Sequence, residues 1–447
     1  MRVVVVGLGE EGHHLTGLLS QWGHEVVAID PSPERCQFEQ EHLDGLVLQG
    51  SGTNPAVLQE AGVNRADLLC AVTGSDETNL VVSLIAKRLG VRRVITRLRE
   101  TLWTQQQIVA LQDFGVDVAI HPERETAEEI LRLLKRAAAT EVWEFSDGRV
   151  QLVGVKLDPD SPWLYRSLSE ISAENGMPPF RVVAVLRAGQ TLVPTGETRL
   201  TRGDQLFLIA KSEDIGEILR KAGKHDRKIQ RVMILGGGRI GRNLASLLEQ
   251  ERDVQIKLIE VQEEKSVQIA TQLQRTMVIH ADGRDVDVLA QEGISEMHAF
   301  VAVTGDDENN IITSLLAKHL GVHKTITLLG RAEYLPLMAP IGLDSAVNVH
   351  TVTANTIMRV IRRGEVVSAA SLPGIDAEVL EFVVSEKAPV TKKPLKALSF
   401  PKGAILGAVT QGGAVEIPVG DTHVRPGAKV VVFCVPEAIQ KVEKILV

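Results

Sequence analysis

The feature that most constrains the fold is a glycine motif that occurs twice, once in each half of the chain. Each copy begins with a short apolar run, residues 3–6 and 232–235, and continues directly into Gly-x-Gly-x-x-Gly. An apolar run of this length followed by such a motif is typical of a buried strand that turns tightly into a helix. The sequence therefore predicts two strand–loop–helix units of the same kind.

The three glycines of each motif have different expected roles. The first makes the turn, the second lets a pyrophosphate approach the backbone, and the third lets the helix pack closely on the strand. The phosphate then lies against the unpaired amides of the helix N-terminus. The glycines are Gly7, Gly9 and Gly12 in the first half and Gly236, Gly238 and Gly241 in the second. The alternative is that they only form turns.

In both halves a second apolar run ends in an acid, Asp30 and Glu260. Both acids lie close to the distance of about 20 residues expected for a carboxylate that binds the ribose hydroxyls of a dinucleotide. A carboxylate there repels a 2′-phosphate, so we expect NAD or an adenosine nucleotide rather than NADP. The alternative is that the two acids are ordinary residues of strand-end turns.

The duplication extends well beyond the glycine motifs. The run 71–79 returns as 302–310, and the run 49–62 returns as 280–293. Copies this long are domains rather than short repeats of a solenoid. From residue 3 to residue 120 strand patterns alternate with helix patterns, which predicts right-handed crossovers and a parallel, doubly wound sheet. Residues 229–350 repeat this pattern.

A helix pattern follows each copy, at about 123–138 and 353–363, and short strands separated by Gly and Pro turns come next. The predicted fold class is therefore α/β, with two doubly wound, Rossmann-like domains that are each followed by a small α+β module whose sheet edge could pair with a second copy. The predicted domains are 1–139, 140–224, 229–351 and 366–447. The basic segment 221–230 is interpreted as a linker, with a membrane-surface contact as the lesser alternative.

Composition excludes several classes of protein. Aromatic residues make up 3% of the 447 residues, so the cores must be built from Val, Leu, Ile and Ala, as in sheets covered by helices. The net charge of −8 argues against a nucleic-acid partner. Three scattered cysteines form neither a disulfide framework nor a zinc site and favour a reducing compartment. No run approaches 18 apolar residues, so we expect no membrane span, and a role at a membrane would need another chain.

With the duplication and both glycine loops in place, the sequence resembles the TrkA family, the peripheral nucleotide-binding subunits of bacterial Trk potassium-uptake systems. That family has the order TrkA-N, TrkA-C, TrkA-N, TrkA-C, also described as tandem RCK domains. The resemblance covers essentially the whole chain. Beside the paired loops it rests on the run that begins at Gly50, on the Ala-Val-Thr-x-x-Asp-Glu-x-Asn run at 71–79, and on Arg97 and Arg99.

The resemblance implies a cytoplasmic assembly, peripheral on the inner face of the cell membrane, that binds NAD or NADH, or ATP or ADP. It implies that the assembly sets the open probability of a Trk-type potassium-translocating membrane subunit and does so without catalysis. It also implies a homo-oligomer, either a dimer or a tetramer ring.

The same resemblance implies two nucleotide sites. The glycine loop, the ribose-binding acid and the residues near the far end of the ligand would form each of them. The first site would contain Gly7, Leu8, Gly9, Glu10, Glu11, Gly12, Asp30, Thr73, Asp76 and Arg97. The second would contain Gly236, Gly238, Arg239, Ile240, Gly241, Glu260, Thr304 and Asp307. No catalytic residue and no metal ligand is expected.

The two sites are expected to differ in charge. Glu10 and Glu11 suit the dipole of the first helix but repel a ligand with four negative charges, which favours a dinucleotide in the first site. Arg239 matches Glu10 and could bind a terminal phosphate, so ATP or ADP is favoured in the second site.

The arginines at 97 and 99 have no predicted counterpart, because the second half has Thr327 and Leu329 at the positions taken to match them. The alternative for Arg97 is a solvated charge at a strand end.

Two rival functions remain open. An NAD-dependent oxidoreductase uses the same fold but needs a proton-transfer group and a substrate-anchoring cation. Residues 150–220 contain no histidine, and the last module has only His423. A nucleotide-sensing subunit of another cation transporter would have much the same sequence. A metal site at residues 306–308 or 76–77 is disfavoured because acids there suit a helix N-terminus.

Overall fold

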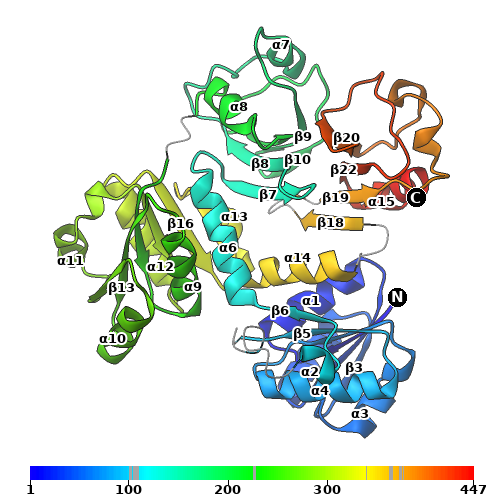
Figure 1. The fold of residues 1–447 in the computed structure, drawn as a ribbon, viewed down its shortest axis with the longest axis vertical. Coiled ribbons are helices and arrows are strands. Elements are labelled where there is room, and N and C mark those ends of the chain that lie inside the picture. The colour runs from blue at the N-terminus through cyan, green and yellow to red at the C-terminus, as the bar shows by residue number, and fades with distance from the viewer. Residues whose placement is uncertain are drawn as a thin grey trace. The chain divides into compact units, whose positions relative to one another are not determined.

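The chain divides into two compact units in the computed structural model (Figure 1). Unit 1 consists of Met1–Ala127 and Asn348–Ile361, and unit 2 of Glu128–Val347 and Arg362–Val447. The structure describes residues 1–99, 103, 110–224, 228–338, 340–361, 366–371, 375 and 377–447.

Unit 1 contains a six-stranded sheet in the order β3-β2-β1-β4-β5-β6. Its neighbouring strands are all parallel. The strands are β1 (Arg2–Val6), β2 (Glu25–Asp30), β3 (Leu46–Gln49), β4 (Leu68–Ala71), β5 (Arg93–Arg97) and β6 (Val118–Ile120). The chain winds outward in both directions from β1, which places a crevice beyond the carboxyl ends of β1 and β4. The predicted doubly wound sheet is confirmed.

Helices connect these strands, and most begin at a residue suited to capping. The helices are α1 (Glu10–Gln21), α2 (Pro33–His42), α3 (Pro55–Glu60), α4 (Asp76–Leu89) and α6 (Pro122–Lys135), with 3-10 turns η1 (Val63–Arg65) and η2 (Leu111–Phe114). Ser32, Asn54 and Ser75 cap α2, α3 and α4 by accepting a backbone N–H. The sequence pattern also predicts a helix over residues 101–114. Most of that range lies outside the described residues, and its last residues form η2.

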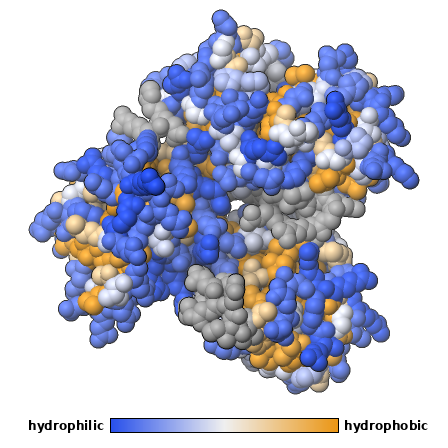
Figure 2. All heavy atoms as spheres, in the orientation of Figure 1, coloured by the Kyte–Doolittle hydropathy of each residue, from blue (hydrophilic) through white to orange (hydrophobic). Residues whose placement is uncertain are grey.

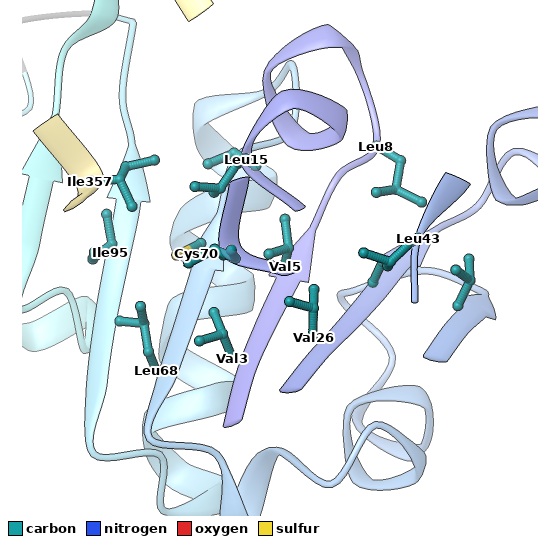
Figure 3. Packing of buried hydrophobic residues seen from close by; sticks show 14 of the residues in the cluster. Val3, Val5, Leu8, Leu15, Val26, Leu43, Leu68, Cys70, Ile95 and Ile357 are labelled. Carbon is teal, nitrogen blue, oxygen red and sulfur yellow. The ribbon is translucent and has the colours of Figure 1, made fainter. Parts of the chain in front are cut away.

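Alternate residues of β1 pack on opposite faces of the sheet. Val3 and Val5 belong to a buried cluster with Leu15 and Leu19 of α1, which Figure 3 shows from close by. Val4 and Val6 belong to a second cluster, to which Leu58 of α3 and Val82 of α4 also contribute. This explains why β1 has no polar residue between Val3 and Val6, since both of its faces are covered.

Helix α14 (Val349–Ile361) follows the second parallel sheet in sequence but belongs to unit 1. Its Ile357 and Val360 join the cluster of Val3 and Leu15. Figure 3 shows Ile357 in this cluster. The Arg93 Nη1 donates to the Val360 carbonyl oxygen at 2.7 Å. The sequence predicts a helix here, at 353–363, but not that it covers the sheet of the first half.

Unit 2 contains a second six-stranded sheet in the order β14-β13-β12-β15-β16-β17. Its strands are β12 (Arg231–Leu235), β13 (Gln255–Glu260), β14 (Thr276–His280), β15 (Ala299–Ala302), β16 (Lys324–Leu329) and β17 (Ser345–Asn348). Its helices are α9 (Arg239–Glu249), α10 (Glu263–Gln272), α11 (Val286–Gln291), α12 (Asp307–His319) and α13 (Leu335–Met338), with 3-10 turns η3 (Ile294–Glu296) and η4 (Ala332–Tyr334). This repeats the strand order of the first sheet, as the duplication predicts.

Two small antiparallel sheets, also in unit 2, form the predicted α+β modules. The first has the order β10-β9-β11-β8-β7, with β7 (Glu141–Phe145), β8 (Val150–Lys156), β9 (Phe180–Arg187), β10 (Gln190–Leu192), β11 (Gln205–Lys211) and helices α7 (Leu168–Ser172) and α8 (Ile215–Lys221). The second has the order β18-β19-β22-β20-β21, with β18 (Val366–Ser371), β19 (Glu378–Val383), β20 (Ala404–Gln411), β21 (Ala414–Glu416), β22 (Lys429–Cys434), 3-10 turns η5 (Pro389–Thr391) and η6 (Leu395–Ala397), and helix α15 (Pro436–Leu446). The sequence does not locate β7, β8, β18 and β19 individually.

The two small modules share one buried cluster, to which Phe145 and Phe207 of the first and Val379 and Phe433 of the second contribute. The buried Glu381 of the second module accepts hydrogen bonds from the Ser146 backbone N–H at 2.8 Å and from its hydroxyl at 2.7 Å. The sheets themselves stay separate. The contact between these two modules is therefore made by side chains and not by pairing of sheet edges.

The surface and the helices bear on the expectation that the chain has no membrane span. The face drawn in Figure 2 is mostly hydrophilic, with smaller hydrophobic areas between. Within the described parts of the chain, no helix is both long and apolar enough to cross a membrane.

The packing of α14 leads to a stability prediction. Ile357 is 1% exposed, so Ile357→Ala should lower the free energy of unfolding of unit 1 by about 2–5 kcal/mol. Hydrogen exchange at the amides of β1 measures this locally. The control is Ile312→Ala, because Ile312 is 63% exposed and its truncation should change stability little. Unchanged protection of β1 in Ile357→Ala would show that α14 does not stabilise this sheet.

Candidate functional site

The first glycine loop has the geometry that its motif predicts. Gly7 has φ of +103°, in the region that favours glycine. A Cβ atom at Gly12 would lie 1.8 Å from the Gly7 carbonyl oxygen, so only glycine fits there. Gly9 is extended, and a Cβ atom there would meet nothing within 4 Å. The second glycine thus faces open space at the start of α1, where a helix has amides without intrahelical partners.

The second glycine loop repeats this geometry. Gly236 has φ of +111°, and a Cβ atom at Gly241 would lie 2.0 Å from the Gly236 carbonyl oxygen. Gly238 is extended and again faces open space. Neither α1 nor α9 has a side-chain cap at its N-terminus. Both loops can therefore hold a phosphate against helix amides.

The two strand-end acids are buried and brace the glycine loops. The Asp30 carboxylate accepts hydrogen bonds from the backbone N–H groups of Leu8 at 2.7 Å and Ser32 at 2.8 Å. The Glu260 carboxylate likewise accepts from Gly237 at 2.9 Å and Gln262 at 3.0 Å. The sequence does not reveal this contact. Each carboxylate oxygen can accept a further hydrogen bond, so bracing is compatible with ribose binding.

The loop after β4 lies against the first glycine loop. A Cβ atom at Gly7 would be 2.9 Å from the Thr73 backbone N. The Thr73 N–H and hydroxyl both donate to the Asn79 Oδ1, at 2.9 and 2.7 Å. Thr304 and Asn310 repeat this arrangement at 3.0 and 2.7 Å. The two asparagines were missed as site-forming residues, although they end the repeated runs 71–79 and 302–310.

Asp76 and Asp307, the two acids predicted near the far end of the ligand, accept hydrogen bonds from backbone N–H groups. The Asp76 carboxylate accepts the Arg99 N–H with both oxygens, at 2.9 and 3.0 Å. The Asp307 carboxylate accepts from Gly330 at 2.8 Å and from Arg331 at 2.9 Å. Both acids lie at the crevice and fix the turn that follows the next strand. Among the described residues, no group of three or more His, Cys, Asp or Glu side chains is placed to hold a metal ion.

The residues of the second half that correspond to Arg97 and Arg99 are not the ones that the sequence predicts. The Asn79 Nδ2 donates to the Arg97 carbonyl oxygen at 2.9 Å, and the Asn310 Nδ2 donates to that of Leu328 at 3.0 Å. Leu328 is therefore the counterpart of Arg97, and Gly330 is that of Arg99. The predicted counterparts Thr327 and Leu329 were wrong by one residue. Neither Leu328 nor Gly330 is an arginine, so the second half still has no arginine at the positions of Arg97 and Arg99.

Arg97 is buried between two glutamates and is not a solvated charge. Its Nε lies 2.7 Å from the Glu11 Oε2, and its Nη2 lies 3.8 Å from the Glu123 Oε1. The three side chains are only 10%, 8% and 15% exposed. The Nε–H is not aimed at the Glu11 oxygen, so this contact is an ion pair rather than a hydrogen bond. The sequence did not identify Glu123 as a partner of Arg97, because it belongs to no motif and is distant from Glu11 and Arg97 in the sequence.

Burial raises the pKa of Glu11 to about 7. The positive charge of Arg97 opposes this rise in pKa, and the negative charge of Glu123 adds to it. Desolvation therefore dominates over the ion pair, as is common for a carboxylate taken out of water. Near neutral pH the first site holds a carboxyl group that can gain or lose a proton.

The remaining loop residues differ between the sites. The Glu10 side chain is exposed, and its Oε2 lies 3.0 Å from the His350 Nε2 of α14. Its counterpart Arg239 is also exposed. Ile240 stands at the Glu11 position and is 9% exposed, and Leu328 at the Arg97 position is 8% exposed. An apolar pair in the second site thus replaces the ion pair of the first.

A cavity of about 560 Å³ lies elsewhere, between the two small modules. Apolar side chains such as Phe180, Phe400 and Leu406 line it, together with Arg181 and Lys396. None of its lining residues belongs to either glycine loop, so it is distinct from the predicted nucleotide sites.

Comparison with known families defines the class of this chain. The TrkA-N domain model matches residues 3–122 and 232–349, which contain the two parallel sheets. The TrkA-C domain model matches residues 152–223 and 379–447, within the two small modules. The chain is thus a tandem TrkA-N/TrkA-C protein.

Full-length relatives give the family. The chain is 32% identical over 451 residues to Trk system potassium uptake protein TrkA homolog 1 of Methanosarcina mazei, covering 99% of both chains. It is also 32% identical over 451 residues to Trk system potassium uptake protein TrkA of Halomonas elongata, covering 100% of this chain and 98% of that one. The chain therefore belongs to the TrkA family of Trk potassium-uptake proteins, as its sequence predicts.

A solved structure with the same fold is that of the GsuK channel bound to NAD. Its TM-score is 0.62 at 20% identity, and the match covers 100% of this chain and 78% of that one. At this identity the likeness shows the fold, and it agrees with the predicted RCK arrangement.

The glycine contacts lead to a matched pair of variants within α1. Gly12→Ala places a methyl group on the Gly7 carbonyl oxygen and should lower the free energy of unfolding by about 1–3 kcal/mol. Gly17→Ala meets nothing within 4 Å and should raise that free energy, by up to about 1 kcal/mol. Urea unfolding of both variants measures the difference. Equal stability of the two would show that the loop does not need its third glycine.

The raised pKa of Glu11 leads to a pH prediction. Because the folded chain holds this proton up to about pH 7 and the unfolded chain only to about 4.5, stability should fall as pH rises through that window. Glu11→Gln removes this loss and should be more stable than the parent chain at pH 8 by about 1–3 kcal/mol, with little difference at pH 4.5. The measurement is urea unfolding across this range, with the exposed Glu34→Gln as control. If the free energy of unfolding of the parent chain and of Glu11→Gln changed with pH in the same way, the prediction would be contradicted.

Proposed function

We propose that this chain is a nucleotide-sensing regulatory subunit that binds NAD or NADH and ATP or ADP, and that its nucleotide state gates a Trk-type potassium-translocating membrane subunit. The observation that carries the proposal is the pair of glycine loops. Each leaves open space over its second glycine at the start of a helix, in a chain of the TrkA family. The GsuK channel, which shares the fold, is a protein that binds NAD.

In this proposal each ligand lies across a crevice between two loops. The pyrophosphate lies against the helix after Gly9 or Gly238, and the ribose hydroxyls bind Asp30 or Glu260. The far end of the ligand reaches the loops of Thr73 and Thr304. The contributing residues are Gly7, Leu8, Gly9, Glu10, Glu11, Gly12, Asp30, Thr73, Asp76 and Arg97 in the first site, and Gly236, Gly238, Arg239, Ile240, Gly241, Glu260, Thr304 and Asp307 in the second.

The sites are proposed to prefer different ligands. Glu10 and Glu11 add negative charge to the first loop, which disfavours a triphosphate more than a dinucleotide. The exposed Arg239 lies at the matching position in the second loop and can pair with a terminal phosphate. NAD or NADH is therefore assigned to the first site, and ATP or ADP to the second.

The regulatory step is a shift between two arrangements of neighbouring domains. A ligand shifts such a balance only by binding one arrangement better than the other. The coupling is typically about 1–3 kcal/mol per site. In a symmetric ring of copies, here a dimer or tetramer, several sites would add to switch an attached pore. We place this assembly on the cytoplasmic face of the membrane, with binding but no turnover of the nucleotide.

Binding is tested with matched glycine variants. Gly9 and Gly238 are extended and have room for a side chain, so Gly9→Val and Gly238→Val should fold normally. Each added side chain occupies the place of the phosphate and should weaken the nucleotide in its own site at least about tenfold. Isothermal titration with NAD, NADH, ATP and ADP measures this, with Gly17→Ala as control. If both variants bind all four ligands like the parent chain, the loops are not the nucleotide sites.

Regulation is tested in cells. Deleting the gene for this chain while the membrane subunit remains should abolish nucleotide-dependent potassium uptake, and Gly9→Val or Gly238→Val should restore it only in part. Undiminished uptake, with loss of transport of another cation, would assign the chain to a different transporter. Steady oxidation of NADH by the purified chain with a carbonyl compound would instead indicate an oxidoreductase.

A further inference from the structure

The far half of the first crevice contains a charged group that the second crevice lacks. Asp30 ends β2 on one side of β1, and Arg97 ends β5 beyond the other side. A dinucleotide with its adenosine ribose at Asp30 and its pyrophosphate at Gly9 therefore extends over the ends of β4 and β5. The group at its far end, the nicotinamide, meets the side chains that lie there.

The Glu11–Arg97 ion pair spans this part of the first crevice. The Arg97 Nη1 donates to the Thr73 carbonyl oxygen at 3.3 Å, while its Nε lies 2.7 Å from the Glu11 carboxylate on α1. Glu123 lies on the other side of the guanidinium, at 3.8 Å. Arg99 places a second positive charge near Glu11, and Glu10 places a third carboxylate there. With all five groups ionised, three carboxylates outweigh two arginines, so the net charge around Glu11 is negative. Glu11, Arg97 and Glu123 are largely shielded from water.

The second crevice has no charge at the positions that match Glu11 and Arg97. Ile240 replaces Glu11 and Leu328 replaces Arg97, and both are buried. The backbone frame is alike in the two halves, since Thr304 and Asn310 repeat the contacts of Thr73 and Asn79. The exposed Arg239 in place of Glu10 is a further difference in charge. The two sites therefore present the same frame to a dinucleotide but a different charge to its far end.

Resting on the proposed function, we propose that the first site selects the oxidised dinucleotide over the reduced one, and that Glu11 is the residue that sets this preference. The nicotinamide ring carries a positive charge in NAD⁺ and none in NADH, whereas the rest of the molecule is the same. A negative cluster shielded from water attracts that charge more strongly than an exposed one does. The second site, with its apolar pair, distinguishes the two forms less.

Proton release is a second consequence. A cation near Glu11 favours its ionised form, so bound NAD⁺ lowers a pKa that stands at about 7 in the unliganded chain. Burial lowers the pKa of His121, so this histidine adds no positive charge at neutral pH. The ionisable groups on the elements around Glu11 are Glu10 of α1, Asp76 of α4, Arg97 and Arg99 at the end of β5, His121 and Glu123 at the start of α6, and His350 of α14. Binding of NAD⁺ near pH 7 should therefore release a proton, and binding of NADH should not.

The experiment titrates full-length chains in which one site is blocked. Gly238→Val leaves the first site open, and Gly9→Val leaves the second. At pH 8 the ratio of NAD⁺ to NADH affinity should be about tenfold higher in the first site than in the second. Adding Glu11→Gln to the Gly238→Val chain should remove most of this difference by weakening NAD⁺ alone. The control is Glu34→Gln in the same background, which should change neither affinity.

Calorimetry in two buffers of different ionisation enthalpy measures the number of protons released on binding and needs no substitution at Glu11. The Gly238→Val chain should release roughly half a proton per NAD⁺ bound at pH 7 and close to none per NADH. Equal affinity ratios in the two sites, or no difference in proton release between the two forms, would overturn the role of Glu11 and leave the proposed function standing. Absence of any dinucleotide binding in the Gly238→Val chain would overturn both.

Discussion

The close contact between the first and third glycines of each loop is the constraint on which the rest of the molecule depends. A Cβ atom at Gly12 or Gly241 would lie within 2.0 Å of the carbonyl oxygen of the first glycine. This approach brings the helix N-terminus to the end of the central strand, and the buried Asp30 or Glu260 then fixes the loop by accepting a backbone N–H from it. Without these contacts there would be no concave edge at which a phosphate could meet helix amides.

Much of the fold could be predicted from the sequence because its signals are local. An apolar run of strand length followed by a glycine turn and a helix pattern specifies one unit, and its repetition specifies two. The packing of α14 could not be predicted in this way. The spacing of Ile357 and Val360 shows that the helix has an apolar side, but nothing local tells which sheet that side covers. Contacts between residues far apart in sequence leave no periodic signal.

The geometry of the glycine loops could be predicted from their motif, but the contacts around them could not. The glycines have the expected geometry, but the bracing role of Asp30 was missed, because a strand-end carboxylate is equally suited to a ribose or to a loop amide. Glu123 was missed because it reaches Arg97 from a helix that follows β6. The predicted counterpart of Arg97 was wrong by one residue, and the hydrogen bonds from Asn79 and Asn310 and the strand pairing of β4 with β5 and of β15 with β16 fix the register. In a strand, a shift of one residue changes the face on which a side chain lies.

Duplication has conserved the frame of the two sites within this chain while their chemistry has separated. Thr73 and Thr304 make the same contacts, as do Asn79 and Asn310, so the loops keep one geometry. The side chains at the Glu11 and Arg97 positions form an ion pair in the first half and are apolar in the second. Under the proposed function, two sites with one backbone frame and two charge environments would respond to different nucleotides.

The most direct test of the central claim is a structure of the full-length chain determined with a nucleotide bound. The account predicts density for a pyrophosphate against the helix amides that follow Gly9 and Gly238, with the ribose within hydrogen-bond distance of Asp30 and Glu260. Density confined to the cavity between the two small modules, with both glycine loops empty at saturating nucleotide, would contradict it.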